Sequence, residues 1–375
     1  MDCSLYIHIP FCTQKCSYCH FYVIPNKEDY QLLLMDGLRR EWELRLPLLK
    51  GQRIRSVYLG GGTPFLLGAD RVGALLSMIR QQGLLCPDAE ITIEANPENI
   101  EAHTLAAMME HGVNRISMGV QSFDDRLLKN IGRTHGAKQA RDAVERIAST
   151  GITNISIDLM YDLPTQTLEH WKHSLAIASA LPITHLSLYN LTLEPHTVFY
   201  KQRESIQRAM PDEETSTAMY AEAIETLEAS GLLQYEISAF ARPGYRSEHN
   251  SGYWLARPFL GLGPSAFSYW NGTRFRNMAN IHRYARALHE GILPCDFEET
   301  LAPDAARREL LIIALRLRDG VDLDAFQAAH GPLEQEVLNT LQHHCSLGLL
   351  EKTGARIRLT RDGVFVYDSL ASELV

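Results

Sequence analysis

The chain has 375 residues, 45% of them hydrophobic and 22% charged, and this length suits a barrel with a smaller appended module better than one small domain. Its formal net charge of −9 argues against a nucleic-acid-binding surface, because a duplex-binding face normally carries a basic excess. No run of roughly eighteen apolar residues occurs and Met1–Ser4 does not begin a signal peptide, so we expect neither a spanning helix nor export.

Short β-rich segments alternate with longer amphipathic ones along the first two thirds of the chain. The pattern predicts strands at 4–9, 55–60, 90–94, 114–120, 153–158 and 184–191. It predicts helices at 28–47, 70–82, 101–110, 137–150, 167–179 and 213–230. Repeated strand-then-helix order indicates parallel strands joined by right-handed crossovers. We therefore predict an α/β fold, a partial (β/α)6 barrel that stays open rather than a complete eight-fold one.

Three of the seven cysteines lie in one short stretch after the first predicted strand. Cys12, Cys16 and Cys19 have the spacing C-x3-C-x2-C. A loop of this length can wrap three thiolates around one face of a cuboidal iron–sulfur cluster and leave the fourth iron without a protein ligand. Structural zinc prefers two separated ligand pairs in a closed shell of four, and a disulfide would leave one thiol unpaired. Chance proximity of three thiols is the remaining alternative.

The other four cysteines are far apart in the sequence and suggest no disulfide framework. A cluster bound by thiolates also requires a reducing compartment. We therefore expect a cytoplasmic protein.

Polar or glycine-rich segments stand at the carboxyl ends of five predicted strands, where ligands bind in such barrels. They are Tyr6 with the cysteine loop, Gly60-Gly61-Gly62-Thr63-Pro64, Glu94-Ala95-Asn96-Pro97, Gln121-Ser122 and Asp158. Together they predict one shared site. The glycines would let the backbone approach a ligand closely, although such turns are common without a ligand. For Glu94 and Asp158 the alternative is a capping or loop-fixing role.

The cysteine motif, with aromatic Tyr18 before the third cysteine, resembles that of the radical S-adenosyl-L-methionine (SAM) superfamily. The resemblance implies a [4Fe-4S] cluster on Cys12, Cys16 and Cys19, whose open iron is chelated by the amino and carboxylate groups of SAM. The flanking Tyr6-Ile7-His8-Ile9-Pro10-Phe11-Cys12 is similar to the oxygen-independent coproporphyrinogen oxidase family.

The same resemblance implies which residues bind SAM. The glycine segment, with Gly61, Gly62 and Thr63, would hold the methionyl amino group. The other implied SAM contacts are Tyr6, Glu94, Gln121, Arg133 and Asp158. The chemistry suits these residue types, because arginine can grip a carboxylate with two parallel hydrogen bonds. Carboxylates and the glutamine amide can bind ribose hydroxyls and an amine.

The segment His249-Asn250-Ser251-Gly252-Tyr253-Trp254 offers an imidazole and flat apolar surfaces to a porphyrin. From chemistry alone, a packed aromatic cluster with a structural histidine is the better interpretation. The H-N-x-x-Y-W pattern, however, resembles that of HemW-type haem chaperones. This resemblance implies haem as a ligand and His249 as its axial ligand. His8, His20 and the pair His343-His344 are weaker candidates.

Residues from about 300 onward form a separate predicted module. Helices at 307–317, from 322 and at 334–347, followed by a β-hairpin over 350–368 that turns at Gly354, resemble a winged helix. From Leu301 to Val375 there are 8 Lys/Arg against 11 Asp/Glu, a net charge of −3, which favours a lid or docking role over DNA binding. We thus predict three parts: the cluster- and SAM-binding barrel at 1–240, a connection carrying the H-N-x-x-Y-W stretch at 241–300, and the winged-helix-like module at 301–375.

Three functions fit this sequence. The first is a haem chaperone, without assigned catalytic residues, that passes haem to an unidentified acceptor protein. The second is oxygen-independent coproporphyrinogen III dehydrogenase, in which a radical derived from SAM starts the decarboxylation of a propionate. Those enzymes carry a further cysteine where this chain has Phe21, and an N-terminal extension, whereas here the motif begins at residue 12. The third is another radical SAM enzyme, such as a methyltransferase.

Whether the chain is an enzyme at all is left open by the sequence. The partners we expect are haem and its acceptor, with no nucleic acid. Any membrane contact would be peripheral and would go through the acceptor. We expect a monomer or a dimer.

Overall fold

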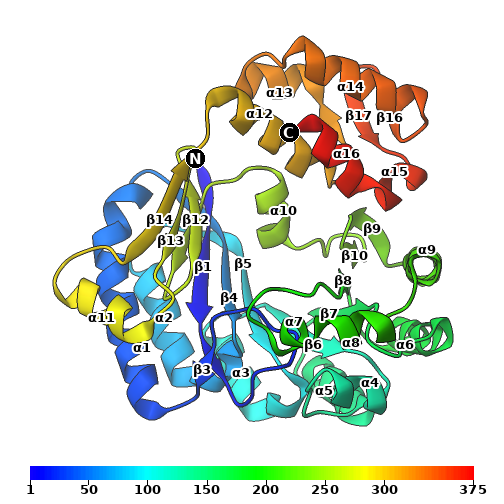
Figure 1. Cartoon of the computed structure of the whole chain (residues 1–375). Coiled ribbons are helices and arrows are strands. Elements are labelled where there is room, and N and C mark those ends of the chain that lie inside the picture. Colours follow the sequence, from blue (N-terminus) through cyan, green and yellow to red (C-terminus); the bar gives the residue numbers. More distant parts are fainter.

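One curved sheet of twelve strands organises residues 2–300 of the computed structural model, which describes all 375 residues (Figure 1). Six of its strands follow one another as parallel neighbours in chain order: β1 (Asp2–Ile9), β4 (Arg53–Gly61), β5 (Leu85–Ala95), β6 (Arg115–Gln121), β7 (Asn154–Tyr161) and β8 (His185–Asn190). Each overlaps a predicted strand. The prediction of an α/β fold with an open, partial barrel is confirmed.

The helices that join these strands lie along the outside of the curved sheet (Figure 1). The six long ones are α1 (Glu28–Arg45), α2 (Ala69–Arg80), α3 (Ala102–Glu110), α5 (Ala137–Ser149), α6 (Leu168–Ala180) and α9 (Glu213–Ala229). All six were predicted, with small shifts at their ends. The short helices that the sequence pattern did not reveal are α4 (Asp125–Asn130), α7 (Val198–Lys201) and α8 (Arg203–Ala209).

Both edges of the sheet are extended by later parts of the chain. β10 (Ala239–Ala241) pairs antiparallel with β8, and β9 (Leu233–Glu236) pairs antiparallel with β10. Next to β1 lies the parallel β11 (Phe259–Leu262), followed by antiparallel β12 (Phe267–Trp270), β13 (Thr273–Asn277) and β14 (Cys295–Thr300). The helices α10 (Glu248–Trp254) and α11 (Ile281–His289) belong to the same region. The segment 241–300 therefore adds strands to the barrel sheet, while the three-part division of the chain stays a prediction.

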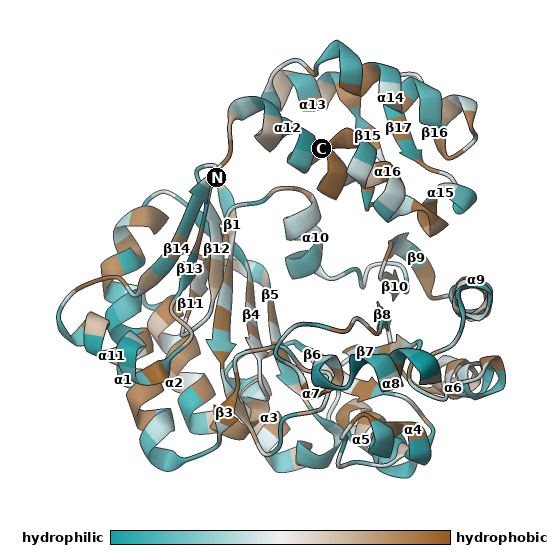
Figure 2. Ribbon diagram, viewed as in Figure 1, coloured by the Kyte–Doolittle hydropathy of each residue, from teal (hydrophilic) through white to brown (hydrophobic).

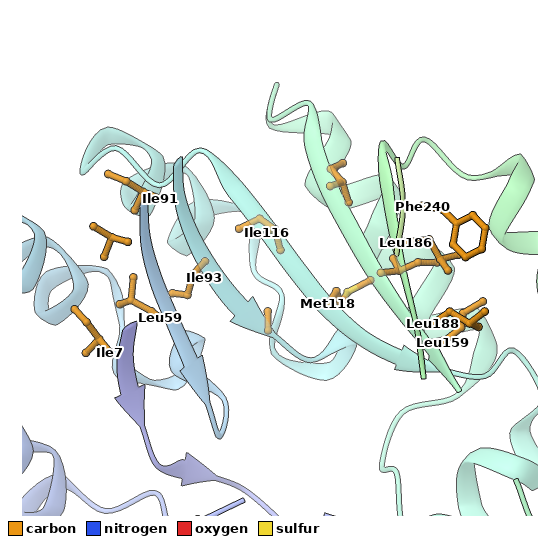
Figure 3. Packing of buried hydrophobic residues seen from close by; sticks show 14 of the residues in the cluster. Ile7, Leu59, Ile91, Ile93, Ile116, Met118, Leu159, Leu186, Leu188 and Phe240 are labelled. Atoms are coloured by element: carbon orange, nitrogen blue, oxygen red, sulfur yellow. The ribbon is translucent and has the colours of Figure 1, made fainter. Parts of the chain in front are cut away.

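The strands alternate between apolar residues that face the helices and polar residues that face the inside of the curve. In β1, Leu5, Ile7 and Ile9 are fully buried in the main hydrophobic core, and Figure 2 shows the resulting bands of apolar and polar residues along the strands. Figure 3 shows the apolar set packed together across the sheet, from Ile7 and Leu59 to Leu186 and Phe240. Because side chains alternate with a period of two, every second position is left for the concave inner face, which we call the lumen.

The C-terminal module packs at the amino-end side of β1, close to α10 and β9 (Figure 1). Its elements are α12 (Pro303–Leu315), β15 (Val321–Asp322), α13 (Leu323–His330), α14 (Gln335–Ser346), β16 (Leu350–Thr353), β17 (Arg356–Leu359), α15 (Arg361–Phe365) and α16 (Tyr367–Leu374). The strands form an antiparallel sheet in the order β15-β17-β16. This helix and strand order is that of a winged helix, with two helices added at the end.

The predicted hairpin over 350–368 is too long. The two strands end at Leu359, with Gly354 in the turn at a positive φ of 61° as expected, and residues from Arg361 onward are helical. The side chain of Thr360 accepts a hydrogen bond from the amide of Gly363 (3.0 Å) and so begins the helix. The burial of Tyr367, Leu370 and Leu374 has helical rather than strand spacing.

No helix in the structure combines the length and the apolar character needed to cross a membrane.

A buried carboxylate ties α1 to the strands that close one edge of the sheet. Glu41 is fully buried and accepts hydrogen bonds from Arg45 (3.2 Å), Asn277 (2.7 Å), Tyr284 (2.8 Å) and the amide of Gly263 (2.9 Å). Arg45 is itself only 3% exposed. These four hydrogen bonds satisfy the carboxylate and connect α1 to α11 and to the β11–β13 region.

Replacing Glu41 by alanine should lower the free energy of unfolding by about 3–5 kcal/mol, because Arg45 is left as a buried charge without its partner. Urea unfolding measures this change. The control is Glu43→Ala, two residues along the same helix, where the exposed pair with Arg39 contributes at most about 1 kcal/mol. Equal losses in the two variants would contradict the assignment.

Candidate functional site

Cys12 ends the short strand β2 (Phe11–Cys12), and Cys16 and Cys19 lie on the loop that leads from it to its paired strand β3 (Ile24–Pro25). The loop is anchored at its centre, where the amide of Ser17 donates to the carbonyl of Ile131 (3.2 Å) and the carbonyl of Ser17 accepts from the amide of Phe199 (3.0 Å). The amide of Cys19 donates to the carbonyl of Cys16 (3.2 Å). Backbone bonds to two separate segments and one bond within the loop therefore hold it in one conformation.

The thiols are partly buried and free of disulfides. Burial raises the pKa of Cys12 to about 11 and also raises that of Cys19, and the neighbouring thiols reinforce both shifts. In the free chain these groups are therefore protonated near neutral pH, and a bound metal would displace the protons. Nowhere do three His, Cys, Asp or Glu side chains converge on the position of one metal ion. The thiolates of a cuboidal cluster bind different irons, so they do not need to converge on one position.

Two of the thiols are joined to the barrel by a chain of three polar side chains. Thr63 Oγ1 lies 3.6 Å from Cys12 Sγ and accepts from Asn96 Nδ2 (2.8 Å). Asn96 Oδ1 accepts from Arg133 Nη2 (2.7 Å), and Arg133 Nη1 donates to Cys16 Sγ (3.7 Å). We call this chain the Thr63–Asn96–Arg133 bridge. It connects the cysteine loop to the segments that follow β4, β5 and β6.

The glycine segment after β4 packs against the start of the cysteine loop. The amide of Gly62 donates to the carbonyl of Ile9 (2.9 Å), and that of Thr63 donates to the carbonyl of Phe11 (2.7 Å). A Cβ on Gly62 would lie 2.6 Å from the Phe11 carbonyl oxygen, so only glycine fits. The close approach that the glycines permit is thus to the chain's own backbone. Because an ammonium group only donates hydrogen bonds, the carbonyl oxygens of this segment would have to accept them from a ligand.

Two carboxylates, Glu94 on β5 and Asp158 on β7, enter the lumen from strands that flank β6. Glu94 accepts from the hydroxyl of Tyr58 (2.8 Å) and from the amide of Gly61 (2.9 Å). Asp158 lies 3.5 Å from the hydroxyl of Ser117. Burial raises the pKa of Glu94 to about 7 and that of Asp158 to about 6, in spite of these hydrogen bonds. A cationic ligand would favour the charged form of both.

Gln121 ends β6 in the left-handed region, with φ of 70°, a conformation that is costly for a non-glycine residue. Its Oε1 is buried and has no hydrogen-bond partner, and neither has Nε of Arg133. The side chains of Gln121, Arg133 and Asn96 meet at Gly119, where a Cβ would lie within 3.0–3.4 Å of all three. Unpaired buried polar atoms are the pattern that a bound ligand would complete.

These features fit the groups that the sequence motif implies. Three thiols on one anchored loop suit the cluster. An arginine and an unpaired amide oxygen suit a carboxylate and a hydroxyl or ammonium, and two lumen carboxylates suit a sulfonium cation. The predicted residues Cys12, Cys16, Cys19, Gly61, Gly62, Thr63, Glu94, Gln121 and Arg133 are linked by the contacts above, and Tyr6 and Asp158 line the lumen beside them. Their roles as ligands stay predictions.

Asn96, Tyr58 and Gly119 are parts of the site that sequence reasoning did not assign. Tyr58 on β4 pairs in register with Tyr6, and Gly119 on β6 pairs with Asp158. Asn96 directly follows the end of β5. The alternation of inward- and outward-facing positions within the strands is the sequence pattern that identifies Tyr58 and Gly119 as inward-facing.

His249 lies apart from the cysteine loop, on α10, and is 1% exposed. Its Nδ1 is 2.9 Å from Ser56 Oγ, and its Nε2 is 2.8 Å from the hydroxyl of Tyr253. Burial, together with the charges of Arg257 and Arg115, lowers its pKa to about 3. Both ring nitrogens are thus occupied, and the axial-ligand role stays a prediction that this geometry does not favour.

The weaker histidine candidates have other surroundings. His8 is buried between the hydroxyl of Tyr6 (3.0 Å) and the carbonyl of Tyr22 (2.9 Å). His20 is exposed beside Phe21. His343 and His344 belong to α14 of the C-terminal module.

Comparison with known proteins adds a full-length similarity. The family model of the Radical SAM superfamily matches residues 6–178, and that of the HemN C-terminal domain matches residues 301–366. The heme chaperone HemW of Bacillus subtilis is 34% identical over 366 residues, 96% of each chain. That of Escherichia coli is also 34% identical, over 98% of this chain and 96% of its own.

Among solved structures, coproporphyrinogen III oxidase (HemN) from Escherichia coli, described as a radical SAM enzyme, covers 100% of this chain and 90% of its own. The TM-score is 0.87 and the sequence identity is 26%.

Replacing Glu94 by glutamine should remove a pH dependence of stability. The folded state holds this proton more tightly than the unfolded chain does, because the pKa lies near 7 instead of the ordinary 4.5. The stability that results is fully present below about pH 4.5 and is lost as the pH rises through 7. Between pH 4.5 and 8, urea unfolding should therefore show a loss of about 1–3 kcal/mol in the wild-type chain relative to Glu94→Gln.

The matched control is Glu110→Gln on the exposed side of α3, which should keep the wild-type profile. Parallel profiles for the wild type and Glu94→Gln would show that Glu94 does not titrate in this range.

Proposed function

Because this chain belongs to the HemW heme chaperone family within the radical SAM superfamily, we propose that it binds haem and transfers it to an acceptor protein. The observation that carries the proposal is similarity to chaperones of that name along nearly the whole chain. The H-N-x-x-Y-W segment and the position of Phe21, where the related dehydrogenases have a further cysteine, support the same function.

We further propose that the chain carries a [4Fe-4S] cluster on Cys12, Cys16 and Cys19, with exchangeable SAM on the open iron. When bound, the reduced cluster supplies an electron that can cleave the sulfonium. The chain's own residues would orient both groups. Arg133 approaches Cys16 and lies beside Gln121, so it can hold the SAM carboxylate close to the cluster. Glu94, Asp158 and Tyr6 would line the nucleoside side.

The reducing conditions that a thiolate-bound cluster needs lead us to propose a cytoplasmic protein. The acidic C-terminal module would act as a lid or as the docking surface for the acceptor, rather than as a DNA-binding domain. Any contact with a membrane would go through the acceptor. The oligomeric state we propose is a monomer or a dimer.

Oxygen-independent coproporphyrinogen III dehydrogenase is the second candidate, and the likeness to HemN along the full chain favours it. The two functions differ in what happens to a porphyrin. A chaperone holds haem in a fixed ratio and releases it unchanged. The dehydrogenase would convert propionate side chains to vinyl groups over many turnovers.

One preparation separates the two functions. Anaerobically reconstituted chain is titrated with haemin and followed through the Soret band, and a second portion receives coproporphyrinogen III, SAM and a strong reductant. The proposal expects saturable haem binding and no decarboxylated product. Product formed over many turnovers would restore the dehydrogenase, and failure to bind haem would remove the chaperone.

Changing Cys12, Cys16 and Cys19 together to alanine should abolish iron–sulfur absorbance and SAM binding after reconstitution, because no other part of the chain offers three clustered thiols. Iron content, absorbance and SAM binding by equilibrium dialysis are the measurements. Cys295→Ala, at an exposed thiol on β14, is the control and should keep the full spectrum. An unchanged spectrum in the triple variant would place the cluster elsewhere.

A further inference from the structure

Helix α10 carries two side chains that could bind haem iron, and only one of them is partly exposed. His249 is fully buried beneath the ring of Tyr58, with ring centroids 4.9 Å apart. Tyr253, one helical turn later, is partly exposed and packs edge-on against Phe259, with ring centroids 4.6 Å apart. Its hydroxyl covers the one nitrogen of His249 that could turn towards the lumen.

The hydrogen bonds of Ser56 determine which nitrogen of His249 carries the proton. The hydroxyl of Ser56 donates to Ser4 Oγ (2.9 Å), so its own hydrogen is used. It must therefore accept from Nδ1–H of His249 at 2.9 Å. Nε2 is left with a free electron pair, which accepts the O–H of Tyr253 at 2.8 Å.

His249 is also held where it is by its own backbone. Glu90 on β5 accepts hydrogen bonds from the amides of Glu248 and His249, each at 3.0 Å, and from the hydroxyl of Ser247 at 3.4 Å. These bonds fix the first turn of α10 against the barrel. An imidazole fixed on both nitrogens and at its amide is poorly placed to swing into the lumen.

Tyr253, by contrast, is partly exposed, and its side chain is hydrogen-bonded only through the hydroxyl. The carboxylate of Glu94 lies within electrostatic reach, and after burial it is the second factor that raises the pKa of Tyr253. A phenolate at Tyr253 would in turn raise the pKa of Tyr6. The hydroxyl of Tyr253 is thus bonded to the buried imidazole and lies within electrostatic reach of two residues that we place beside SAM, Glu94 and Tyr6.

We propose that Tyr253 is the axial ligand of ferric haem in this protein and that His249 is the positioning residue behind it. The inference rests on the proposed haem-binding function and replaces His249 in the ligand role. Tyrosinate is an established ligand of haem iron. With ferric haem bound, an iron–oxygen bond would replace the O–H bond of Tyr253, and the proton would pass to Nε2 of His249 with no change in oxidation state. The phenolate charge beside the imidazole would then offset the burial and the arginine charges that lower the pKa of His249 in the free protein. The hydrogen bond then persists with its direction reversed.

In the free protein, burial and Glu94 keep Tyr253 protonated. The positive charge of ferric iron reverses this preference, as bound metal ions do for other ligands. Ser56 remains hydrogen-bonded to Nδ1 throughout, while Ser4 holds Ser56, and together they keep the ring in place, as the outer partners of metal sites commonly do.

The test uses the full chain loaded with haemin and examined by resonance Raman and electron paramagnetic resonance spectroscopy. Protein made with ring-deuterated tyrosine should show shifted phenolate vibrations in the haem complex. Tyr253→Phe should lose these vibrations and the associated charge-transfer absorbance. His249→Gln should keep them at a changed frequency, because the ligand remains while its hydrogen-bond partner differs. Tyr189→Phe, at a lumen tyrosine that is 45% exposed and has no histidine partner, is the control and should match the wild type.

Each other outcome has a definite meaning when circular dichroism shows that the variants are folded. Histidine-type spectra that survive in Tyr253→Phe and vanish in His249→Gln would overturn the inference and leave the chaperone function intact. Phenolate vibrations that survive in Tyr253→Phe would also overturn it, with Tyr6, hydrogen-bonded to His8, as the next residue to change. Wild-type protein that binds no haemin would remove the proposed function itself.

Discussion

The arrangement of the site depends on the Thr63–Asn96–Arg133 bridge. The cysteine loop follows β1, and its backbone is attached to other segments at only a few points. The bridge adds side-chain contacts to two of the sulfurs. Its three residues belong to the segments that follow β4, β5 and β6, so it links the sulfurs to all three strands. Since those strands belong to one parallel sheet, the rigidity of the sheet is passed to the thiols. The sulfurs of Cys12 and Cys16 therefore keep their spacing before any cluster is present.

The lumen exists because each strand is apolar on one side and polar on the other. A parallel sheet covered by helices on both faces usually reads as continuous apolar strands. Here helices cover the outer face, and the inner face carries tyrosines, serines, carboxylates and histidines that bond to one another. The cysteine loop lies at one end of this polar column and α10 at the other. A single fold feature thus connects the proposed SAM site with the proposed haem ligand.

Much of the fold could be predicted from sequence because period-two and helical patterns persist through long, regular segments. All six central strands and all six long helices were found in this way. The hairpin over 350–368 was wrong beyond Leu359, because a short amphipathic helix and a short strand differ little in pattern and only the cap at Thr360 distinguishes them. Glu94, Gln121 and Asp158 were recognised as a group, although Asp158 was wrongly placed at the end of its strand, because β7 continues to Tyr161. Asn96 was not singled out, since its role lies in linking two side chains that are distant in sequence. The hydrogen bonds on both sides of His249 also could not be foreseen, because Ser56 and Tyr253 meet it only in the folded barrel.

Mössbauer spectroscopy of chain reconstituted with ⁵⁷Fe, with and without SAM, tests the central claim most directly. The claim is that three loop cysteines hold a cluster whose fourth iron is open to an outside ligand. It predicts a [4Fe-4S] spectrum in which SAM changes the signal of one iron and leaves the other three unaltered. A spectrum without a four-iron cluster, or one in which no iron responds to saturating SAM, would contradict the account.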